Sequence, residues 1–289
     1  MSYAGGAARG GAALLLNPGL VIDLQSHSIY SDGELPPAEV VAAAADAAIT
    51  TMALSDHDAV DGIDEASRAA AERDLALVPA AEISCIHEAI DDLHMLGYWI
   101  DVAAMAPVCE RAQQERVARA QEIVARLNSL DVPVRFEDAI AAAGDASSVG
   151  RPHIAKAAGV TPEQMSPFFE EYLVPGSKAF VSRRWPIAAE AVDLIHQAGG
   201  VAVLAHPFWD LDATASVAAL IDDLDLDGVE VFYPAHTREQ TAFLLETCSD
   251  RGLAATGSSD FHGPSHKIFN AFGVYPTYDL GEPELPPKP

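Results

Sequence analysis

The stretch VIDLQSHSIYSDGELPP, from Val21 to Pro37, begins as an apolar run and continues into closely spaced polar side chains. The run from 21 to 24 has the pattern of a short strand. Side chains able to hold a metal follow within the next few positions: Asp23, Gln25, His27, Ser31 and Asp32. Their density at the end of one strand indicates one wall of a functional site.

Short apolar runs alternate with alanine-rich helical patterns along much of the chain. The runs predict strands at 21–24, 50–56, 76–84, 92–100, 200–207, 226–232 and 253–262. Strand and helix alternating in this order predict an α/β fold with a parallel sheet. The number of strand–helix units favours closure of that sheet into a barrel.

The middle of the chain, residues 108–185, has the periodicity of amphipathic helices and only one strand-like run, at 178–182. We interpret it as an all-helical insertion domain, which makes the barrel discontinuous. The other predicted boundaries are 19–107 and 186–278 for the barrel, and 1–18 and 279–289 for two flexible tails.

Acidic residues outnumber basic ones, with 43 Asp and Glu against 17 Lys and Arg and a formal net charge of −26. A surface of that charge repels long polyanions, which argues against a broad nucleic-acid-binding face. A small phosphorylated substrate stays compatible with this charge if metal ions or a local basic pocket offset the field.

The three cysteines, Cys85, Cys109 and Cys248, are widely spaced and predict no disulfide framework, as in a reducing compartment. No apolar run approaches the roughly 18 residues of a membrane span. The apolar run near the N-terminus is too short for a secretory signal. We therefore expect a cytoplasmic protein without a membrane segment.

Metal-ligating side chains recur at the ends of the predicted strands. Beyond the opening stretch they are His57, Glu82, His94, His206, Asp260 and His262. The carboxyl ends of parallel strands share one face, so these side chains are expected to converge. Any one of them alone is more often a hydrogen-bonded structural residue, but their recurrence from strand to strand predicts a metal centre.

With these residues the chain resembles the PHP (polymerase and histidinol phosphatase) family, and within it the stand-alone phosphoesterases that act on nucleotides. The matching pieces occur in family order: DLQSHSIYSDG, LSDHDAVDG, AAEIS, LHMLGY, GRPHIAKA, LAHP, GVEVFYPAHT and SSDFHG. The resemblance implies a distorted (β/α)7 PHP barrel with a centre of three metals. Mixed histidine and carboxylate ligands suit Mn²⁺, Fe²⁺ or Zn²⁺.

The resemblance also implies which residues hold each ion. The first ion takes Gln25, His27, Glu82 and Asp260; the second shares Glu82 and adds His94 and His206; the third takes Asp32, His57 and His262. The family pattern has His-x-His where this chain has Gln25-Ser26-His27, and an amide oxygen is a weaker ligand than an imidazole. We expect a weakened first site that still fills; an empty first site, with two bound ions, is the alternative.

Divalent ions in such a cluster activate water and neutralise phosphoryl charge. The resemblance therefore implies a metal-dependent hydrolase that releases phosphate from nucleotides, or acts on the ends of short oligonucleotides, through a hydroxide that bridges the metals. Two alternatives stay open. One is a phosphatase of another small phosphomonoester, such as histidinol phosphate; the other is a non-catalytic PHP scaffold domain, which only Gln25 favours.

Further side chains are expected to protonate the leaving group and to bind the substrate. Asp58 and His206 are candidate acids for the leaving group, and a metal-bound water is the alternative. Arg151 and His153 stand at a predicted helix start, where backbone N–H groups and a guanidinium favour phosphate.

Four further basic residues bear on substrate binding. Lys178 and His236 are candidates for contact with the substrate. Arg183 and Arg184, an adjacent basic pair, are interpreted instead as solvated or salt-bridged residues.

Overall fold

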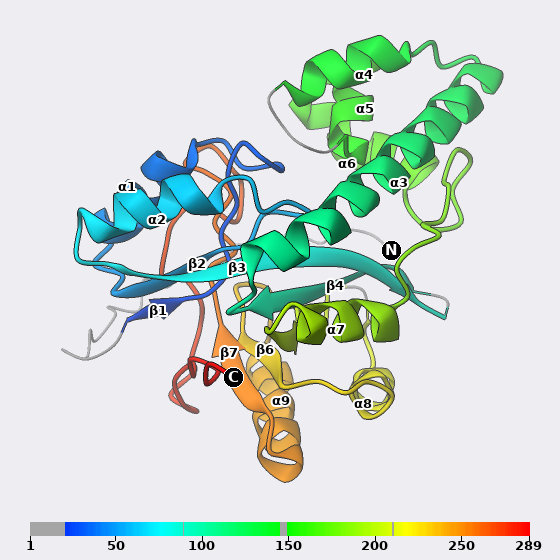
Figure 1. The fold of residues 1–289 in the computed structure, drawn as a ribbon. Coiled ribbons are helices and arrows are strands. Elements are labelled where there is room, and N and C mark those ends of the chain that lie inside the picture. Colours follow the sequence, from blue (N-terminus) through cyan, green and yellow to red (C-terminus); the bar gives the residue numbers. More distant parts are fainter. Residues whose placement is uncertain (1–20, 89, 145–148, 210) are drawn as a thin grey trace.

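A computed structural model describes residues 21–88, 90–144, 149–209 and 211–289. The expected tail at residues 1–18 lies outside these described residues. Within them, seven strands form one sheet whose spatial order follows the chain (Figure 1). The strands are β1 (Ile22–Asp23), β2 (Thr51–Leu54), β3 (Ala76–His87), β4 (Ile90–Tyr98), β5 (Val201–Leu204), β6 (Gly228–Phe232) and β7 (Ala254–Gly257).

The two edges of the sheet approach each other and nearly close it into a barrel. The backbone N–H of Leu24, just after β1, donates to the carbonyl of Gly257 at the end of β7 over 3.2 Å. Beyond both strands, Ser26 and Phe261 form a parallel bridge. The seven-stranded α/β barrel predicted from the sequence is confirmed.

The sheet is mixed, so the prediction of a wholly parallel sheet is wrong for one strand. β4 runs antiparallel to both of its neighbours, β3 and β5, while the other adjacent pairs are parallel. Only two residues separate His87, the last of β3, from Ile90, the first of β4. A parallel pair needs a crossover of about a dozen residues or more. The hairpin places the start of β4 beside the carboxyl end of β3, with His94 opposite Ser84.

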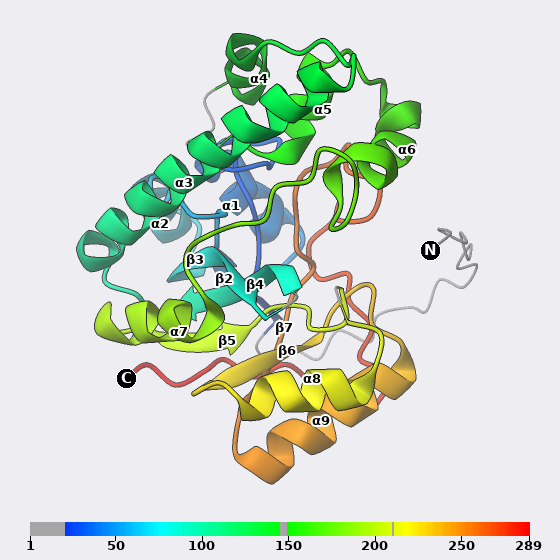
Figure 2. The same ribbon diagram turned by 90° about the vertical axis from the view of Figure 1, so that its right-hand side faces the viewer.

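Helices cover the outside of the barrel (Figures 1 and 2). α1 (Pro37–Asp46) and α2 (Ile63–Ala71) pack against β2 through an apolar cluster that includes Val40 and Met52. The side of β4 to β7 is covered by α7 (Ala188–Gln197), α8 (Thr214–Asp222) and α9 (Arg238–Arg251). None of the helices in the described part of the chain is both long and apolar enough to cross a membrane.

The residues between β4 and α7 form a helical layer that projects from the barrel (Figure 1). Its elements are α3 (Val102–Ser129), α4 (Phe136–Ala143), α5 (Arg151–Ala157), η1 (Pro162–Gln164), α6 (Met165–Phe168) and η2 (Phe169–Leu173). The layer has an apolar core of its own, with Ile123, Leu127 and Ile154 among its buried residues. α3 begins before residue 108, because Asp101 caps it by accepting the N–H of Ala104 over 3.0 Å.

The strand-like run at residues 178–182 is not a strand, which corrects that expectation. Arginine side chains donate hydrogen bonds to two of its backbone carbonyls. Arg126 donates to the carbonyl of Phe180, and Arg119 Nε donates to that of Val181 over 2.6 Å. These carbonyls are therefore already paired and form no ladder with a neighbouring strand.

Residues 279–289 contain no helix or strand, yet they lie against the barrel and are not a free tail. The N–H of Glu284 donates to the carbonyl of Ala255 in β7 over 2.8 Å. Trp99 Nε1 donates to the carbonyl of Pro286, also over 2.8 Å. These contacts tie the last residues to the side of the barrel.

Candidate metal centre

One end of the barrel gathers all nine residues predicted to ligate metal. They come from the loop after β1 (Gln25, His27 and Asp32), the loop after β2 (His57), the strands β3 and β4 (Glu82 and His94), and the loops after β5 and β7 (His206, Asp260 and His262). Three overlapping groups among them have ligand atoms that all lie within 4.8 Å of one another. These groups are His27, Asp32, His57 and His262; His57, Glu82 and His94; and His27, Glu82 and Asp260.

The carboxylate of Glu82 is the hub of the centre. Its Oε2 lies 3.1 Å from His27 Nε2 and 3.4 Å from His57 Nδ1. Its Oε1 lies 2.9 Å from His94 Nδ1 and 3.2 Å from His206 Nε2. Two atoms that bind one ion at about 2.1 Å lie roughly 3.0–3.4 Å apart. Each oxygen of Glu82 is therefore placed to share an ion with a histidine.

The register of the sheet explains why Glu82 and His94 meet. In the antiparallel β3–β4 pair, His94 lies opposite Ser84, two residues beyond Glu82. Both side chains consequently project from one face as diagonal neighbours. His206 enters from the end of β5, with its Nε2 3.5 Å from His94 Nδ1. The three side chains form a compact triangle of ligand atoms.

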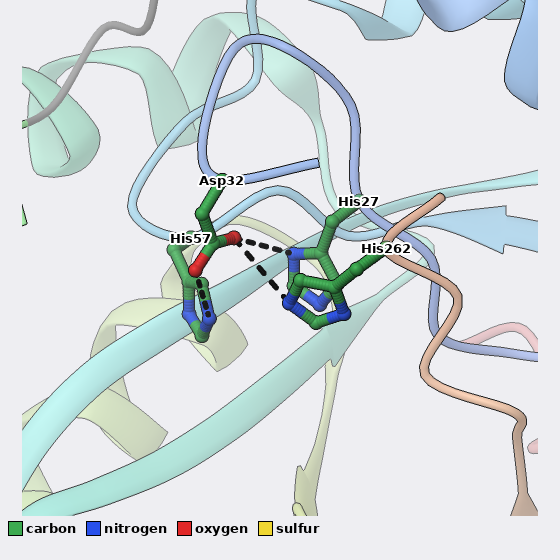
Figure 3. A group of neighbouring side chains, drawn as sticks. All are labelled: His27, Asp32, His57 and His262. Carbon is green, nitrogen blue, oxygen red and sulfur yellow. Dashed lines mark ion pairs between the residues drawn. The ribbon is translucent and has the colours of Figure 1, made fainter. Parts of the chain in front are cut away.

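Asp32 joins three histidines on the more exposed side of the centre (Figure 3). Its Oδ1 lies 3.5 Å from His262 Nε2 and 3.8 Å from His27 Nδ1, and its Oδ2 lies 3.8 Å from His57 Nε2. The Nδ1–H of His262 donates to the carbonyl of Asp260 over 2.7 Å. This bond fixes the tautomer and leaves Nε2 of His262 as the ligand atom.

The loop after β1 is held in place by a buried carboxylate. Asp56 accepts hydrogen bonds from the N–H and the Oγ of Ser28, both over 2.7 Å, and from the Oγ of Ser31 over 2.6 Å. The turn also requires glycine at position 33, because a Cβ on Gly33 would lie 2.3 Å from the carbonyl oxygen of His27. The SDG sequence thus shapes the turn that presents the ligands.

The chemistry of the centre fits a bound cation. Three of its buried polar atoms have no hydrogen-bond partner among the described residues: His27 Nε2, His57 Nδ1 and Asp260 Oδ1. Although burial opposes ionisation, the surrounding histidines hold the pKa of Glu82 well below its usual range. Burial lowers the pKa of His57 to about 3, so this imidazole is neutral. Despite burial, which disfavours the charged form, hydrogen bonds to the carboxylates raise the pKa of His206 to about 9 and that of His27 well above its usual value, so metal binding would displace protons from these two rings. Ionised carboxylates and deprotonated imidazoles are the donors that divalent transition metals prefer.

Gln25 lies inside the centre, but its amide nitrogen faces the hub carboxylate. Nε2 donates to Glu82 Oε2 over 2.9 Å, and Oε1 accepts from Ser258 Oγ over 3.4 Å. In this orientation Gln25 positions Glu82 and turns its oxygen away from the ligand atoms. The predicted role of Gln25 as a ligand requires a half turn of the amide.

Asp58 is not placed to act as a leaving-group acid, which corrects that prediction. Its carboxylate forms ion pairs with Arg116 and, at 4.0 Å, with Arg183, and accepts the N–H of Ser84 over 2.9 Å. Although burial opposes ionisation, the two guanidinium groups lower the pKa of Asp58 below its usual value. Asp58 therefore carries no proton to donate at neutral pH. Of the two predicted acids, only His206 lies at the metal centre.

A cavity of about 140 Å³ opens between the barrel and the helical layer, next to the metal centre. Asp32, His57 and His94 of the metal centre form part of its lining. Another part is cationic and is called the arginine wall below. It consists of Arg116 and Arg119 of α3, Arg151 at the start of α5, and Arg183 in the segment before α7.

The arginine wall keeps an excess of positive charge, because among the described residues only two carboxylates, Asp58 and Asp92, form ion pairs with its guanidinium groups. Two donors, Arg119 Nη2 and Arg183 Nε, are buried without a hydrogen-bond partner among the described residues. Burial and the neighbouring arginines lower the pKa of Arg119 to about 9 and that of Arg183 to about 10. A bound anion would relieve both the burial cost and the mutual repulsion.

Of the four predicted substrate-binding residues, Arg151 and His153 line the cavity. His153 accepts the N–H of Gly150 at Nδ1 over 3.1 Å, which leaves its other ring nitrogen as a donor. Lys178 lies apart from the cavity: it is 57% exposed and pairs with Glu171 on the surface of the helical layer.

His236 is also placed away from the cavity. It is buried beside β6, where its Nδ1–H donates to the carbonyl of Val231 over 2.9 Å. Its ring meets that of Phe208 edge to face, with 5.6 Å between centroids. These contacts are those of a packed side chain in the barrel wall.

Three members of the arginine wall, Arg116, Arg119 and Arg183, were not predicted as site residues. A usable signal was present in α3, since Arg116 and Arg119 share a helical stripe with Ala120 and Ile123, which also line the cavity. Arginines on a stripe that is otherwise buried and apolar indicate a polar site facing that stripe. Arg183 is salt-bridged, as interpreted, but it is only 8% exposed and belongs to the cavity.

Comparison with known proteins agrees with this geometry. Residues 23–140 match the model of the PHP domain. The chain is 34% identical over 256 residues to a 3′,5′-nucleoside bisphosphate phosphatase of Chromobacterium violaceum, with 84% of this chain and 87% of that protein covered. It is 34% identical over 269 residues to the 5′-3′ exoribonuclease Rnm of Salmonella typhimurium, with 88% and 89% covered.

A solved structure adds a likeness in three dimensions. A crystal structure described as a metal-dependent phosphoesterase, from Bifidobacterium adolescentis, superposes with a TM-score of 0.77 at 32% sequence identity. The superposition covers 91% of this chain and 94% of that one. With a matching domain model, relatives that extend over most of the chain and a shared fold, the chain belongs to the PHP family.

Proposed function

We propose that this protein is a metal-dependent hydrolase of nucleotide phosphate esters whose substrate carries a second phosphate. The arginine wall is the observation that carries the proposal, because its four guanidinium-bearing residues line the same cavity as three residues of the metal centre, and two of them, Arg119 and Arg183, have an unpaired donor. In a chain with a formal net charge of −26, so local an excess of positive charge favours a small polyanion. A 3′,5′-nucleoside bisphosphate and a 5′-phosphorylated RNA end both have this form.

The named activities of two relatives support a nucleotide substrate. One relative is a 3′,5′-nucleoside bisphosphate phosphatase and the other a 5′-3′ exoribonuclease. Both kinds of substrate present one phosphate ester for cleavage and a second anionic group nearby. The acidic surface of this chain favours the short members of this class over long nucleic acids.

The metal centre would hold two or three divalent ions of the Mn²⁺, Fe²⁺ or Zn²⁺ type, around Glu82 and Asp32. When bound, such ions lower the pKa of a coordinated water and neutralise charge on a phosphoryl group. We assign His206 to metal binding rather than to the leaving group, because its Nε2 faces Glu82 at 3.2 Å.

The chain's own residues orient the substrate. Arg119 and Arg183, with their unpaired donors, would hold the second phosphate. Asp58 and Asp92 fix the guanidinium groups of Arg116, Arg151 and Arg183 before the substrate arrives, so less conformational freedom is lost on binding. His153 offers a ring N–H to an oxygen of the substrate. Together these contacts would present the scissile phosphate to the metal centre in one orientation.

The test is hydrolysis by wild-type protein loaded with Mn²⁺, measured as phosphate release from the small phosphate esters and as release of mononucleotides or phosphate from the RNA. The metal content of the same preparation is measured by elemental analysis. The substrates are adenosine 3′,5′-bisphosphate, adenosine 5′-monophosphate, a 5′-phosphorylated short RNA and histidinol phosphate. We expect kcat/KM for the bisphosphate or the RNA to exceed that for the monophosphate by about tenfold, the effect of one charge-assisted hydrogen bond. Faster release from histidinol phosphate would favour the other phosphatase class. A metal-loaded protein without turnover would favour the scaffold.

A further inference from the structure

A second group of side chains borders the metal centre away from the arginine wall. It is called the aromatic edge and consists of Trp209, Tyr233, His266 and Phe269. None of these four residues lines the cavity between the arginine wall and the metal centre. They come from the turn after β5, the end of β6 and the segment after β7.

The rings of the aromatic edge are in contact with one another and with the predicted ligands. Trp209 lies 6.3 Å from the ring of His206 and 5.8 Å from that of Phe269, measured between centroids. Phe269 stacks on His266 at 5.1 Å with an interplanar angle of 9°. His266 stacks in turn on His262 at 5.2 Å. The edge therefore extends from one side of the metal centre to the other.

Trp209 is the exposed member of this group. Its exposed fraction is 47%, while Tyr233 and Phe269 behind it are 1% and 6% exposed. The turn is held by the N–H of Trp209, which donates to the carbonyl of His206 over 2.8 Å. A single exposed apolar residue needs no explanation by itself. A tryptophan supported by buried rings and held one turn from a metal ligand has the form of a stacking platform.

We propose that the exposed face of Trp209, supported by Phe269 and Tyr233, stacks against the nucleobase of the substrate. This inference rests on the proposed function and adds a third subsite to it. The metal centre takes the scissile phosphate, the arginine wall takes the second phosphate, and the aromatic edge takes the base. Base–aromatic stacking tolerates all four bases, because every base has a π face, so the platform would select nucleotides without selecting a sequence.

The experiment removes the base from the substrate and the ring from the protein in turn. The substrates are adenosine 3′,5′-bisphosphate and base-free 1,2-dideoxyribose 3′,5′-bisphosphate. The proteins are wild type, Trp209→Ala, Trp209→Phe and the control Ile268→Ala, which removes another exposed apolar side chain (55%) near the edge. We expect Trp209→Ala to raise KM for the adenosine substrate about tenfold and to change KM for the base-free substrate less than about twofold. Trp209→Phe retains most of the binding, and Ile268→Ala matches wild type.

An equal loss on both substrates would overturn the proposal, because Trp209 would then support the metal centre rather than bind a base. Unchanged kinetics on both substrates would overturn it as well. Absence of turnover in the wild type would contradict the proposed function instead, and a second measurement then decides the stacking.

That measurement is quenching of tryptophan fluorescence by adenosine 5′-monophosphate. The other two tryptophans, Trp99 and Trp185, are engaged elsewhere, with Pro286 and Arg111 respectively. We expect quenching in the wild type that is abolished in Trp209→Phe and retained in Ile268→Ala. Equal quenching in Trp209→Phe and wild type would contradict the stacking directly.

Discussion

The metal centre and the arginine wall line one cavity but are built in different ways. The ligands of the metal centre lie in or just after the strands, so the sheet sets their positions independently of the helical layer. The arginines lie in the helical layer, and the barrel carboxylates Asp58 and Asp92 form ion pairs with three of the four, Arg116, Arg151 and Arg183. Metal binding therefore depends on the strands and loops of the barrel, whereas recognition of the second phosphate depends on how the helical layer packs against the barrel.

The largest expected effect follows from removing the charge of the hub. Glu82→Gln keeps the shape of the side chain but gives up the carboxylate that contacts four histidines. We expect at least one ion fewer per chain by elemental analysis and a loss in kcat/KM of about 10³-fold, roughly 4 kcal/mol. Glu39→Gln, an exposed change in α1, is the matched control. Full metal content in Glu82→Gln would contradict the claim that the Glu82 carboxylate, unlike that of Glu39, is needed to bind an ion.

The next effect tests the contact between the two regions. Asp58→Asn leaves Arg116 and Arg183 without a charged partner at this position, and we expect the free energy of unfolding of metal-free protein at pH 7 to fall by about 3 kcal/mol. The pKa of Asp58 is lowered in the folded state, so its contribution is full above about pH 4 and is lost as the pH falls through the folded pKa. Urea unfolding at pH 7 and at pH 3 measures this difference.

The same variant separates positioning from proton transfer. Because Asp58 is already ionised, the shape of the pH profile of kcat is expected to stay as in wild type. Loss of one limb of that profile in Asp58→Asn would restore Asp58 as the acid. Asp46→Asn, exposed at the end of α1, should change stability by less than about 0.5 kcal/mol.

Removing the metal tests the barrel end without any mutation. A metal present at about 100 times its dissociation constant stabilises the folded state by about 2.7 kcal/mol. For a chain of this size we expect chelation to lower Tm by about 5 °C or more. Calorimetry with and without Mn²⁺ measures the shift, and Glu82→Gln should show less of it. An identical Tm in both conditions would mean that the centre binds metal too weakly to matter.

The smallest expected effect concerns Gln25. Its amide nitrogen faces Glu82, so Gln25→His replaces a positioning contact with a potential ligand. We expect the most weakly held Mn²⁺ to bind about tenfold more tightly in Gln25→His, as measured by competition with a chelator. Gln25→Ala is the control for loss of the hydrogen bond alone. Unchanged affinity in Gln25→His would mean that position 25 contributes nothing to the first site.

The barrel and the gathering of the metal ligands were predictable from the sequence, because each ligand follows or lies in a short apolar strand. The antiparallel β4 was not anticipated, although the seven residues between the predicted strands 76–84 and 92–100 are already too few for a crossover helix. His94 still reaches the centre, since the hairpin returns it to the same end of the barrel.

The arginine wall was largely missed for a physical reason. Arg119 and Arg183 are 64 positions apart in the numbering and meet only when the helical layer closes on the barrel. Lys178 and His236 were predicted to contact the substrate instead, yet Lys178 is exposed and His236 is packed into the barrel wall. Arg116 and Arg119 had a signal in the helical stripe that they share, whereas Arg183 lies outside any helix or strand and no periodic pattern indicates which side chains face it.

The central claim is that the arginine wall recognises a second phosphate while the metal centre cleaves the first. The most direct test is the ratio of kcat/KM for adenosine 3′,5′-bisphosphate to that for adenosine 5′-monophosphate in wild type, Arg183→Met and Arg184→Gln. Arg184 is the adjacent control, since it is 65% exposed and pairs with Glu122. We predict that Arg183→Met lowers the ratio about tenfold or more and that Arg184→Gln leaves it unchanged. An unchanged ratio in Arg183→Met, with full metal content, would contradict the account.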